Sequence, residues 1–175
     1  MNRIKLEKYI HKYNKDLYDT SAYDFPLFVE AHRLKKCKTD MFNRIVYLHP
    51  KAKKAWKKMK KAAQKEDIKL QIISAFRSYD YQKQLIKNKL AKGICIEEIL
   101  KVNTLPGYSE HHTGCAIDIG SSKEAILEEE FNQSDAFKWL EKNANLFSFY
   151  MTYPKNNTNG ICYEPWHWCY KKHKN

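Results

Sequence analysis

Two short segments, residues 109–118 and 164–167, most constrain what this chain can fold into. The first reads Ser-Glu-His-His-Thr-Gly-Cys-Ala-Ile-Asp and the second Glu-Pro-Trp-His. They offer imidazoles and carboxylates as ligands for a metal such as zinc, and catalytic zinc has three protein ligands and one open position for water. A nearby Glu that binds no metal can take a proton from that water. The chain therefore carries the parts of a metal-dependent hydrolase, on the condition that its fold brings both segments to one point.

The first segment leaves two choices of histidine. His111 lies in an expected loop, and Asp118 follows seven residues later inside or at the end of an expected strand. His112 competes with His111, because adjacent residues of an extended chain point in opposite directions. Spacing alone does not choose between them. A histidine that is simply solvated or hydrogen-bonded, and an Asp118 that is a turn acceptor, are the competing interpretations.

The second segment must bend if it is to supply both a ligand and a base. Glu164 and His167 are three residues apart, and such residues face opposite sides of a regular strand. Pro165 cannot donate to a strand ladder, which favours a bend or a strand start between them. Trp166 then packs on the other face or walls the cleft.

Arg77 is a further candidate, because it lies in a turn between an expected strand and an expected helix, where functional groups are frequent. A guanidinium suits a peptide's terminal carboxylate or a tetrahedral oxyanion. A surface ion pair is the simpler alternative for Arg77. Gln82, five residues later, faces the same way or is an ordinary helix residue.

Hydrophobic periodicity predicts an α+β fold with a small antiparallel sheet that carries the site and is flanked by helices. Helices are expected over residues 1–20, from Pro50 onward, and over 79–90, 96–102 and 135–143; strands are expected over 45–48, 68–74, 115–119, 147–151 and 164–170. Pro50 at a first turn, and Ser78 and Ser134 as caps, support three of these helices.

Composition limits the class of protein. The chain has 175 residues, of which 43% are hydrophobic, so we expect one domain with a real core, not a disordered chain. The net charge of +12 attracts anionic partners such as nucleic acid, anionic lipid or cell-wall polymer, although a generally Lys-rich composition explains it equally well. Five cysteines without a Cys-x-x-Cys pair indicate mostly buried, reduced thiols.

The chain shows no signal-peptide core after its basic N-terminus and no apolar run long enough to span a bilayer. The localisation therefore stays unknown: the pattern is that of a cytoplasmic protein unless the chain is exported by another route or a leader is missing.

The combined pattern resembles a known family. Ser-x-His-x-x-Gly-x-Ala-x-Asp, here residues 109–118, followed by Glu-x-Trp-His, here residues 164–167, is similar to the zinc D-alanyl-D-alanine carboxypeptidases of the VanY type. These belong to the lysostaphin, carboxypeptidase and hedgehog-type metallopeptidase superfamily. The Ser-Ala-Phe-Arg-Ser segment at residues 74–78 also matches the family's order, and the resemblance covers roughly residues 50–170. We therefore expect residues 1–45 to be an N-terminal extension or cap outside a metallopeptidase core of residues 46–172.

The resemblance implies the roles of individual residues. It makes Glu164 the general base and Arg77 the group that binds the substrate carbonyl or carboxylate and stabilises the oxyanion. The metal ligands that it implies are His111, Asp118 and His167, and the substrate site that it implies includes Ser109, Gln82 and Trp166. His112 then occupies a variable position and is not a ligand.

Several positions depart from the family pattern without touching an implied ligand or the base. Ser148 stands where a Gly is usual, Thr152 and Cys169 stand where an Arg is often found, and residues 75–76 are Ala-Phe in place of Gly-Tyr. These departures leave substrate preference open.

The implied activity is removal of C-terminal D-alanine from peptidoglycan stem peptides or muropeptides by a monomer that holds zinc and binds no nucleic acid. An L,D-carboxypeptidase acting on tetrapeptides, a peptidoglycan endopeptidase and a non-enzymatic polyanion-binding protein are the alternatives. Contact of the basic surface with anionic wall polymers is compatible with each of them.

Overall fold

A computed structural model describes residues 2–121, 126–158 and 160–171. Its centre is a four-stranded antiparallel sheet in the order β3 (Gln71–Ser74), β4 (Ala116–Gly120), β6 (His167–Tyr170) and β5 (Phe149–Met151). A separate antiparallel pair joins β1 (Lys35–Thr39) to β2 (Ile45–Leu48). The helices are α1 (Arg3–Asn14), α2 (Pro50–Gln64), α3 (Tyr79–Leu90), α4 (Ile96–Val102) and α5 (Asp135–Asn143), with short 3₁₀ turns η1 (Glu110–Thr113), η2 (Glu129–Gln133) and η3 (Ala144–Phe147). The predicted α+β class with a small antiparallel sheet is confirmed.

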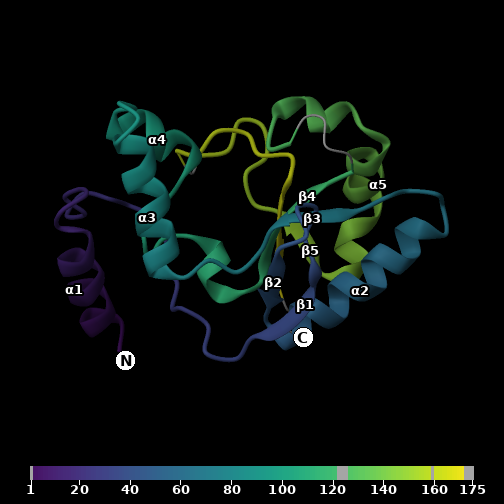
Figure 1. Ribbon diagram of the computed structural model, residues 1–175, viewed down its shortest axis with the longest axis horizontal. Helices are drawn as coiled ribbons and strands as arrows, with labels where there is room; N and C mark the ends of the chain where they lie inside the picture. Colours follow the sequence, from purple (N-terminus) through teal and green to yellow (C-terminus); the bar gives the residue numbers. More distant parts are fainter. Residues whose placement is uncertain (1, 122–125, 159, 172–175) are drawn as a thin grey trace.

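The main apolar core lies between one face of the sheet and helices α2 and α5 (Figure 1). Side chains alternate along a strand, so Ile117 and Ile119 of β4 enter this core while Asp118 points to the opposite face. Trp168 of β6, which pairs with Ile117, enters the same core. The alternation thus leaves polar residues of both central strands on one shared face.

A second apolar cluster joins α1, α3 and α4, which lie together on the other side of the sheet in Figure 1. Ile10 of α1 is fully buried in it, and a side chain built on Gly107 would come within 2.6 Å of the Ile10 Cδ1 atom. The N-terminal helix therefore packs against the loop that leads into η1.

Local sequence signals explain where the helices begin. Ser78 accepts a hydrogen bond from the Tyr81 N–H at 3.0 Å, and Ser134 accepts one from the Phe137 N–H at 3.1 Å, so both N-caps are formed as predicted. The predicted helices 79–90, 96–102 and 135–143 have the observed bounds.

Other predicted bounds were too long, and one strand was missed. The first helix ends at Asn14, and the strands expected from residues 68, 147 and 164 begin only at Gln71, Phe149 and His167. Strand β1 lies in a Lys-rich stretch where polarity hides the alternation, since only Cys37 of its five residues is buried. No helix among the described residues is long and apolar enough to cross a membrane.

Candidate active site

Pairing between β4 and β6 brings Asp118 and His167 together. The register places Asp118 directly opposite His167, one step from the Ile117–Trp168 pair that faces the main core. Opposed residues in an antiparallel pair point to the same face, so both polar side chains leave the sheet on the side away from that core. The Asp118 Oδ1 atom lies 3.2 Å from Nδ1 of His167.

The turn η1 delivers His111 to the same place. Gly114 closes this turn with a φ of +66°, and a Cβ there would lie 2.7 Å from the Leu34 Cδ2 atom and 3.0 Å from the His49 nitrogen. Glycine is therefore required both by the backbone conformation and by the neighbouring chain. The tight turn from η1 into β4 places Nε2 of His111 3.3 Å from Oδ2 of Asp118.

A second turn brings Glu164 to the site. The His167 N–H donates to the Glu164 carbonyl at 3.1 Å, and the Glu164 N–H donates to the Tyr153 carbonyl at 3.0 Å. The chain thus bends between residues 164 and 167 as the sequence required, and Glu164 Oε2 lies 3.8 Å from His167 Nδ1. Trp166 packs partly buried against the main core and is absent from the residues that line the cleft beside Glu164.

The three residues form a compact, buried donor set. One ligand atom from each of His111, Asp118 and His167 lies within 4.8 Å of the other two. Two imidazoles and one carboxylate are a ligand set that suits catalytic zinc, which keeps its fourth coordination position for water.

Hydrogen bonds to the imidazoles distinguish the two neighbouring histidines. His111 Nδ1 lies 2.6 Å from the Ala75 carbonyl and must donate to it, while its buried Nε2 has no hydrogen-bond partner and is directed to the Asp118 side. In His112 both ring nitrogens are used, because Nδ1 donates to the Arg77 carbonyl at 2.7 Å and Nε2 accepts from the Gly107 N–H at 3.1 Å. The geometry therefore leaves a metal-binding lone pair on His111 and none on His112.

Glu110 is a site residue that the sequence reasoning did not single out. Its Oε2 atom lies 3.1 Å from His167 Nε2 and accepts a 2.6 Å hydrogen bond from the Thr152 hydroxyl. The Lys171 ammonium lies 3.6 Å from the other carboxylate oxygen. Its position beside His111 within the motif was the available signal, but only the return of β6 shows which imidazole it contacts.

The electrostatics of the cluster favour a cation. Burial alone would lower the pKa of His167, yet its hydrogen bonds to Asp118 and Glu110 raise that pKa to about 10. Burial opposes ionisation of Asp118 as well, but His111 and His167 hold the pKa of its carboxyl well below the usual range. Three carboxylates around one imidazole stabilise positive charge there, and a divalent ion supplies such charge.

Glu164 behaves differently from the other carboxylates. Burial raises its pKa to about 7. A carboxyl with a pKa near neutrality can both accept and return a proton at physiological pH. A strongly shifted carboxyl in a cleft is a candidate catalytic group.

Arg77 and Gln82 line the same cleft. The Arg77 Nη1 atom donates to Gln82 Oε1 at 3.2 Å, Nη2 lies 3.9 Å from Asp118 Oδ2, and Gln82 Nε2 donates to the Thr104 carbonyl at 2.7 Å. Ser109 lines the cleft too, and its hydroxyl accepts from the His111 N–H at 3.3 Å. The predicted helix therefore does turn Gln82 toward Arg77.

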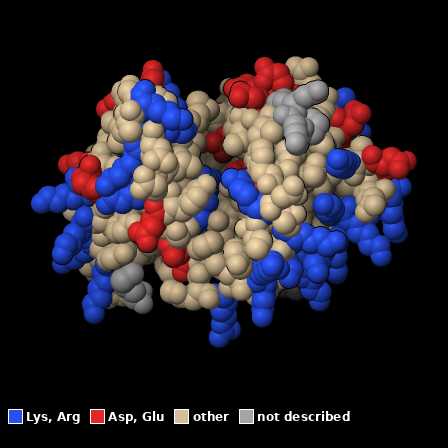
Figure 2. All heavy atoms as spheres, in the orientation of Figure 1, with Lys and Arg blue, Asp and Glu red and all other residues tan. Residues whose placement is uncertain are grey.

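The space enclosed by these residues is about 20 Å³, enough for an ion or a water molecule. The molecular surface is hollowed between the half that carries α1, α3 and α4 and the half that carries α5, and acidic atoms are visible in its depth (Figure 2).

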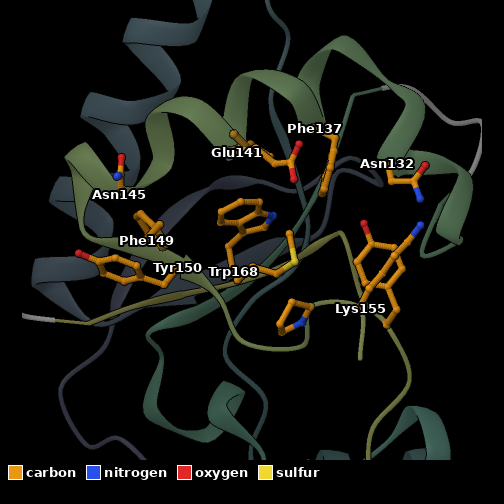
Figure 3. A pocket seen from close by; sticks show the side chains of 12 residues that line it. Asn132, Phe137, Glu141, Asn145, Phe149, Tyr150, Lys155 and Trp168 are labelled. Atoms are coloured by element: carbon orange, nitrogen blue, oxygen red, sulfur yellow. The ribbon is translucent and has the colours of Figure 1, made fainter. Parts of the chain in front are cut away.

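A roomier hollow lies on the other side of the segment that carries Glu164. Figure 3 shows it between α5 and strands β5 and β6, with Phe137 and Glu141 facing Tyr150 and Trp168. Its volume is about 660 Å³, and it shares no lining residue with the cleft that contains His111. It lacks the histidines of a metal centre, so size alone does not mark the reactive site.

A buried His–Asp–His set with a near-neutral carboxyl and a guanidinium beside it is the arrangement typical of one class of protein, the mononuclear zinc hydrolases. Comparison with known proteins identifies the family within that class. Residues 45–173 match the model of the VanY family, described as D-alanyl-D-alanine carboxypeptidase. The chain belongs to this family.

Curated relatives support the same membership. The chain is 38% identical over 125 residues to "Putative carboxypeptidase YodJ" of Bacillus subtilis, covering 69% of this chain and 45% of that protein. It is 33% identical over 132 residues to the bifunctional D-Ala-D-Ala dipeptidase and carboxypeptidase VanXYC of Enterococcus gallinarum, covering 71% of this chain and 67% of the relative. The chain thus spans less than half the length of YodJ.

Solved structures share the fold. The LdcB LD-carboxypeptidase superposes with a TM-score of 0.65 at 36% identity, over 81% of this chain and 64% of that one. VanYB in complex with D-alanine-D-alanine gives 0.64 at 22% identity, over 83% of this chain and 80% of that one. At that lower identity the likeness to VanYB shows the fold alone.

Proposed function

We propose that this chain is a zinc-dependent D,D-carboxypeptidase that removes C-terminal D-alanine from peptidoglycan stem peptides or muropeptides. The observation that carries the proposal is the convergence of His111, Asp118 and His167, with Glu164 3.8 Å from His167. Family membership supports the substrate class, because relatives from Enterococcus faecium and Enterococcus faecalis are named D-alanyl-D-alanine carboxypeptidases.

We assign the metal ligands to His111 Nε2, the Asp118 carboxylate and His167 Nδ1. When bound there, zinc supplies Lewis-acid activation of water and of the scissile carbonyl. The buried Nε2 of His111, which has no hydrogen-bond partner, supports its assignment.

Glu164 has the role of general base and then general acid. Its carboxylate takes one proton as the water oxygen bonds to the carbonyl carbon, and it returns that proton to the departing amino group as the C–N bond breaks. A pKa raised by burial to about 7 suits both transfers at neutral pH.

Arg77 has the role of binding the substrate carbonyl or terminal carboxylate and stabilising the oxyanion. Its contact with Gln82 orients the guanidinium over the cleft, where Ser109 also lies. A planar guanidinium binds a carboxylate through two parallel hydrogen bonds, which fixes the end of a peptide.

An L,D-carboxypeptidase acting on tetrapeptides is the second candidate. The observation that favours this L,D activity is sequence identity. The chain is 36% identical to the LdcB LD-carboxypeptidase and 29% identical to the L,D-carboxypeptidase DacB of Streptococcus pneumoniae, but 22% identical to VanYB.

We also propose a one-domain monomer in which residues 1–45 act as a cap over the metallopeptidase core. Backbone hydrogen bonds support this, because the Phe28 N–H donates to the Gly107 carbonyl and the Ala31 N–H to the His112 carbonyl, each at 2.8 Å.

For partners, we propose contact of the basic surface with anionic wall polymers and none with nucleic acid. The net charge of +12 supports the polymer contact.

The test measures D-alanine released from a muramyl-type pentapeptide and from its tetrapeptide. Wild type, Glu164→Ala and the exposed-site control Glu141→Ala are each assayed with added zinc and with chelator. We expect zinc-dependent release from the pentapeptide by wild type and control, and a loss of at least about 100-fold in Glu164→Ala. Release from the tetrapeptide alone would favour the L,D activity, and no zinc-dependent release from either would exclude both carboxypeptidase assignments.

A further inference from the structure

A groove lined by lysines lies between β1 and α2, away from the catalytic cleft. Its volume is about 660 Å³, and it shares no lining residue with the cleft that contains His111 and Glu164. The floor includes Cys37, Trp56 and Ile72. The lysines that line its walls are Lys36, Lys38, Lys53, Lys57, Lys60 and Lys61.

The net charge of the protein is concentrated in this region. Residues 35–69 contain 13 Lys and Arg against 3 Asp and Glu, so this fifth of the chain carries +10 of the total +12. Figure 2 shows the resulting collection of basic side chains over α2. The remaining chain is nearly neutral, which a uniformly Lys-rich composition does not explain.

Within the part of the chain that the structure describes, no acidic side chain forms an ion pair with these lysines. Asp40 is already paired with Arg44 at 2.7 Å. Partial burial lowers the pKa of Lys60, and the neighbouring Lys38 and Lys69 lower it further. Such crowding of like charge is unfavourable in the free protein and is relieved by a bound polyanion.

Lysines from both elements contribute charge to the groove. Lys53, Lys57 and Lys61 recur every four residues on α2, so their row rises about 12 Å along the helix axis. Lys36 and Lys38 of β1 line the same groove and are exposed. A row of charges along a helix, with further lysines on the other element of the groove, suits one extended chain with repeated negative charges.

The surroundings disfavour a membrane and a nucleic acid. The apolar side of α2, with Ala52, Trp56 and Met59, is buried in the core and cannot enter a bilayer. Trp56 is the aromatic residue of the groove lining and is only 4% exposed, so no ring is available for stacking with bases.

We infer that the groove between β1 and α2 binds a linear, base-free phosphodiester polymer of the polyol-phosphate kind. This localises the anionic-polymer contact proposed above and rests on it for the class of partner, but it is independent of the peptidase reaction. Binding of an immobile polymer would hold the enzyme close to stem peptides without occupying the cleft.

The test measures binding of a fluorescent glycerol-phosphate oligomer by anisotropy over a series of salt concentrations. The groove variant replaces Lys53, Lys57, Lys60 and Lys61 by Gln. The charge-matched control replaces Lys5, Lys12, Lys92 and Lys142, four exposed lysines outside residues 35–69, by Gln. Thermal unfolding and peptide hydrolysis of every variant establish that each is folded.

We expect the groove variant to bind at least about 10-fold more weakly, with a salt slope smaller by about 3, and the control to bind nearly as the wild type does. Equal weakening in both variants, or none in the groove variant, would overturn the proposal. Tighter binding of an oligothymidylate of equal charge or of anionic vesicles would overturn the assignment to a base-free polymer. Unchanged peptide hydrolysis in the groove variant separates failure of the groove from failure of the proposed peptidase.

Discussion

At the scale of single residues, Glu110 contacts His167 and would orient it toward a bound metal. Its carboxylate holds His167 Nε2 at 3.1 Å, which turns Nδ1 toward Asp118. Burial opposes a charge on Glu110, yet the contact with His167 lowers its pKa to about 2, so it is ionised at neutral pH. Carboxylates behind a ligating imidazole fix its tautomer and increase its basicity.

Replacing Glu110 should therefore weaken metal binding. We expect Glu110→Ala to lower zinc affinity by about 10- to 100-fold, with Glu110→Gln between it and wild type because an amide oxygen still accepts the hydrogen bond. Competition with a chromophoric chelator measures this affinity, and Glu130→Ala, an exposed carboxylate in η2, is the control. Unchanged affinity in Glu110→Ala would show that this carboxylate has no positioning role.

The raised pKa of Glu164 predicts a pH-dependent stability. The folded protein binds this proton more tightly than the unfolded chain, so its contribution to stability decreases as pH rises from the ordinary value of 4.5 toward about 7 and stays low above that. In the zinc-free protein, Glu164→Gln should raise the free energy of unfolding by about 3 kcal/mol at pH 8 and by little near pH 4.5.

Denaturant unfolding at several pH values checks this expectation. The exposed Glu141→Gln serves as a control and should show no such change with pH. A Glu164→Gln effect that is equal at all pH values would contradict the assignment of a buried, near-neutral carboxyl.

At the scale of secondary structure elements, the entry into β5 contains a strained residue. Ser148 has a φ of +62° after η3, in the left-handed region that favours glycine. Ser148→Gly should stabilise the protein by about 0.5–1 kcal/mol, because removal of strain outweighs the added flexibility of the unfolded chain.

The same substitution at a different element gives the matched control. Ser134 caps α5 with a φ of −71° and accepts the Phe137 N–H, so Ser134→Gly should destabilise by a few tenths of a kcal/mol. The melting temperatures of the two variants are compared by thermal unfolding. If both substitutions lowered the melting temperature, the backbone of Ser148 would not be strained.

At the scale of the whole molecule, a metal held by His111, Asp118 and His167 would link segments from distant parts of the chain. A ligand that binds only the folded state stabilises it by about 4 kcal/mol at 1,000 times its dissociation constant. Zinc added to the metal-free protein should therefore raise its melting temperature.

The two neighbouring histidines should respond differently to this addition. His111→Ala should abolish the zinc-induced shift, whereas His112→Ala should lower the melting temperature of both forms and keep the shift, because both ring nitrogens of His112 bind the backbone. Differential scanning calorimetry measures both effects. A shift retained in His111→Ala and lost in His112→Ala would reverse the ligand assignment.

Much of the fold could be predicted from the sequence, because the signals that start and pattern the helices are local. Ser78 and Ser134 start helices through bonds within four residues, and the apolar positions of α2 follow the helical period. Strand β1 could not be predicted from the sequence, because lysines occupy most of its positions. Its pairing with β2 forms only in the tertiary structure.

The sequence by itself supplied the candidate residues of the site, which are His111 or His112, Asp118 and His167, with Glu164 and a bend at Pro165. The family resemblance favoured His111 over His112, but the physical reason lies in the tertiary structure, since the carbonyls of Ala75 and Arg77 that bind their rings lie more than thirty residues earlier in the chain. The tertiary structure also decided the role open to Glu110, because its partner His167 lies on β6, 57 residues later. Residue types and local turns can be recognised in short segments of sequence. The direction in which a histidine ring presents its lone pair depends on contacts that form only when distant segments come together.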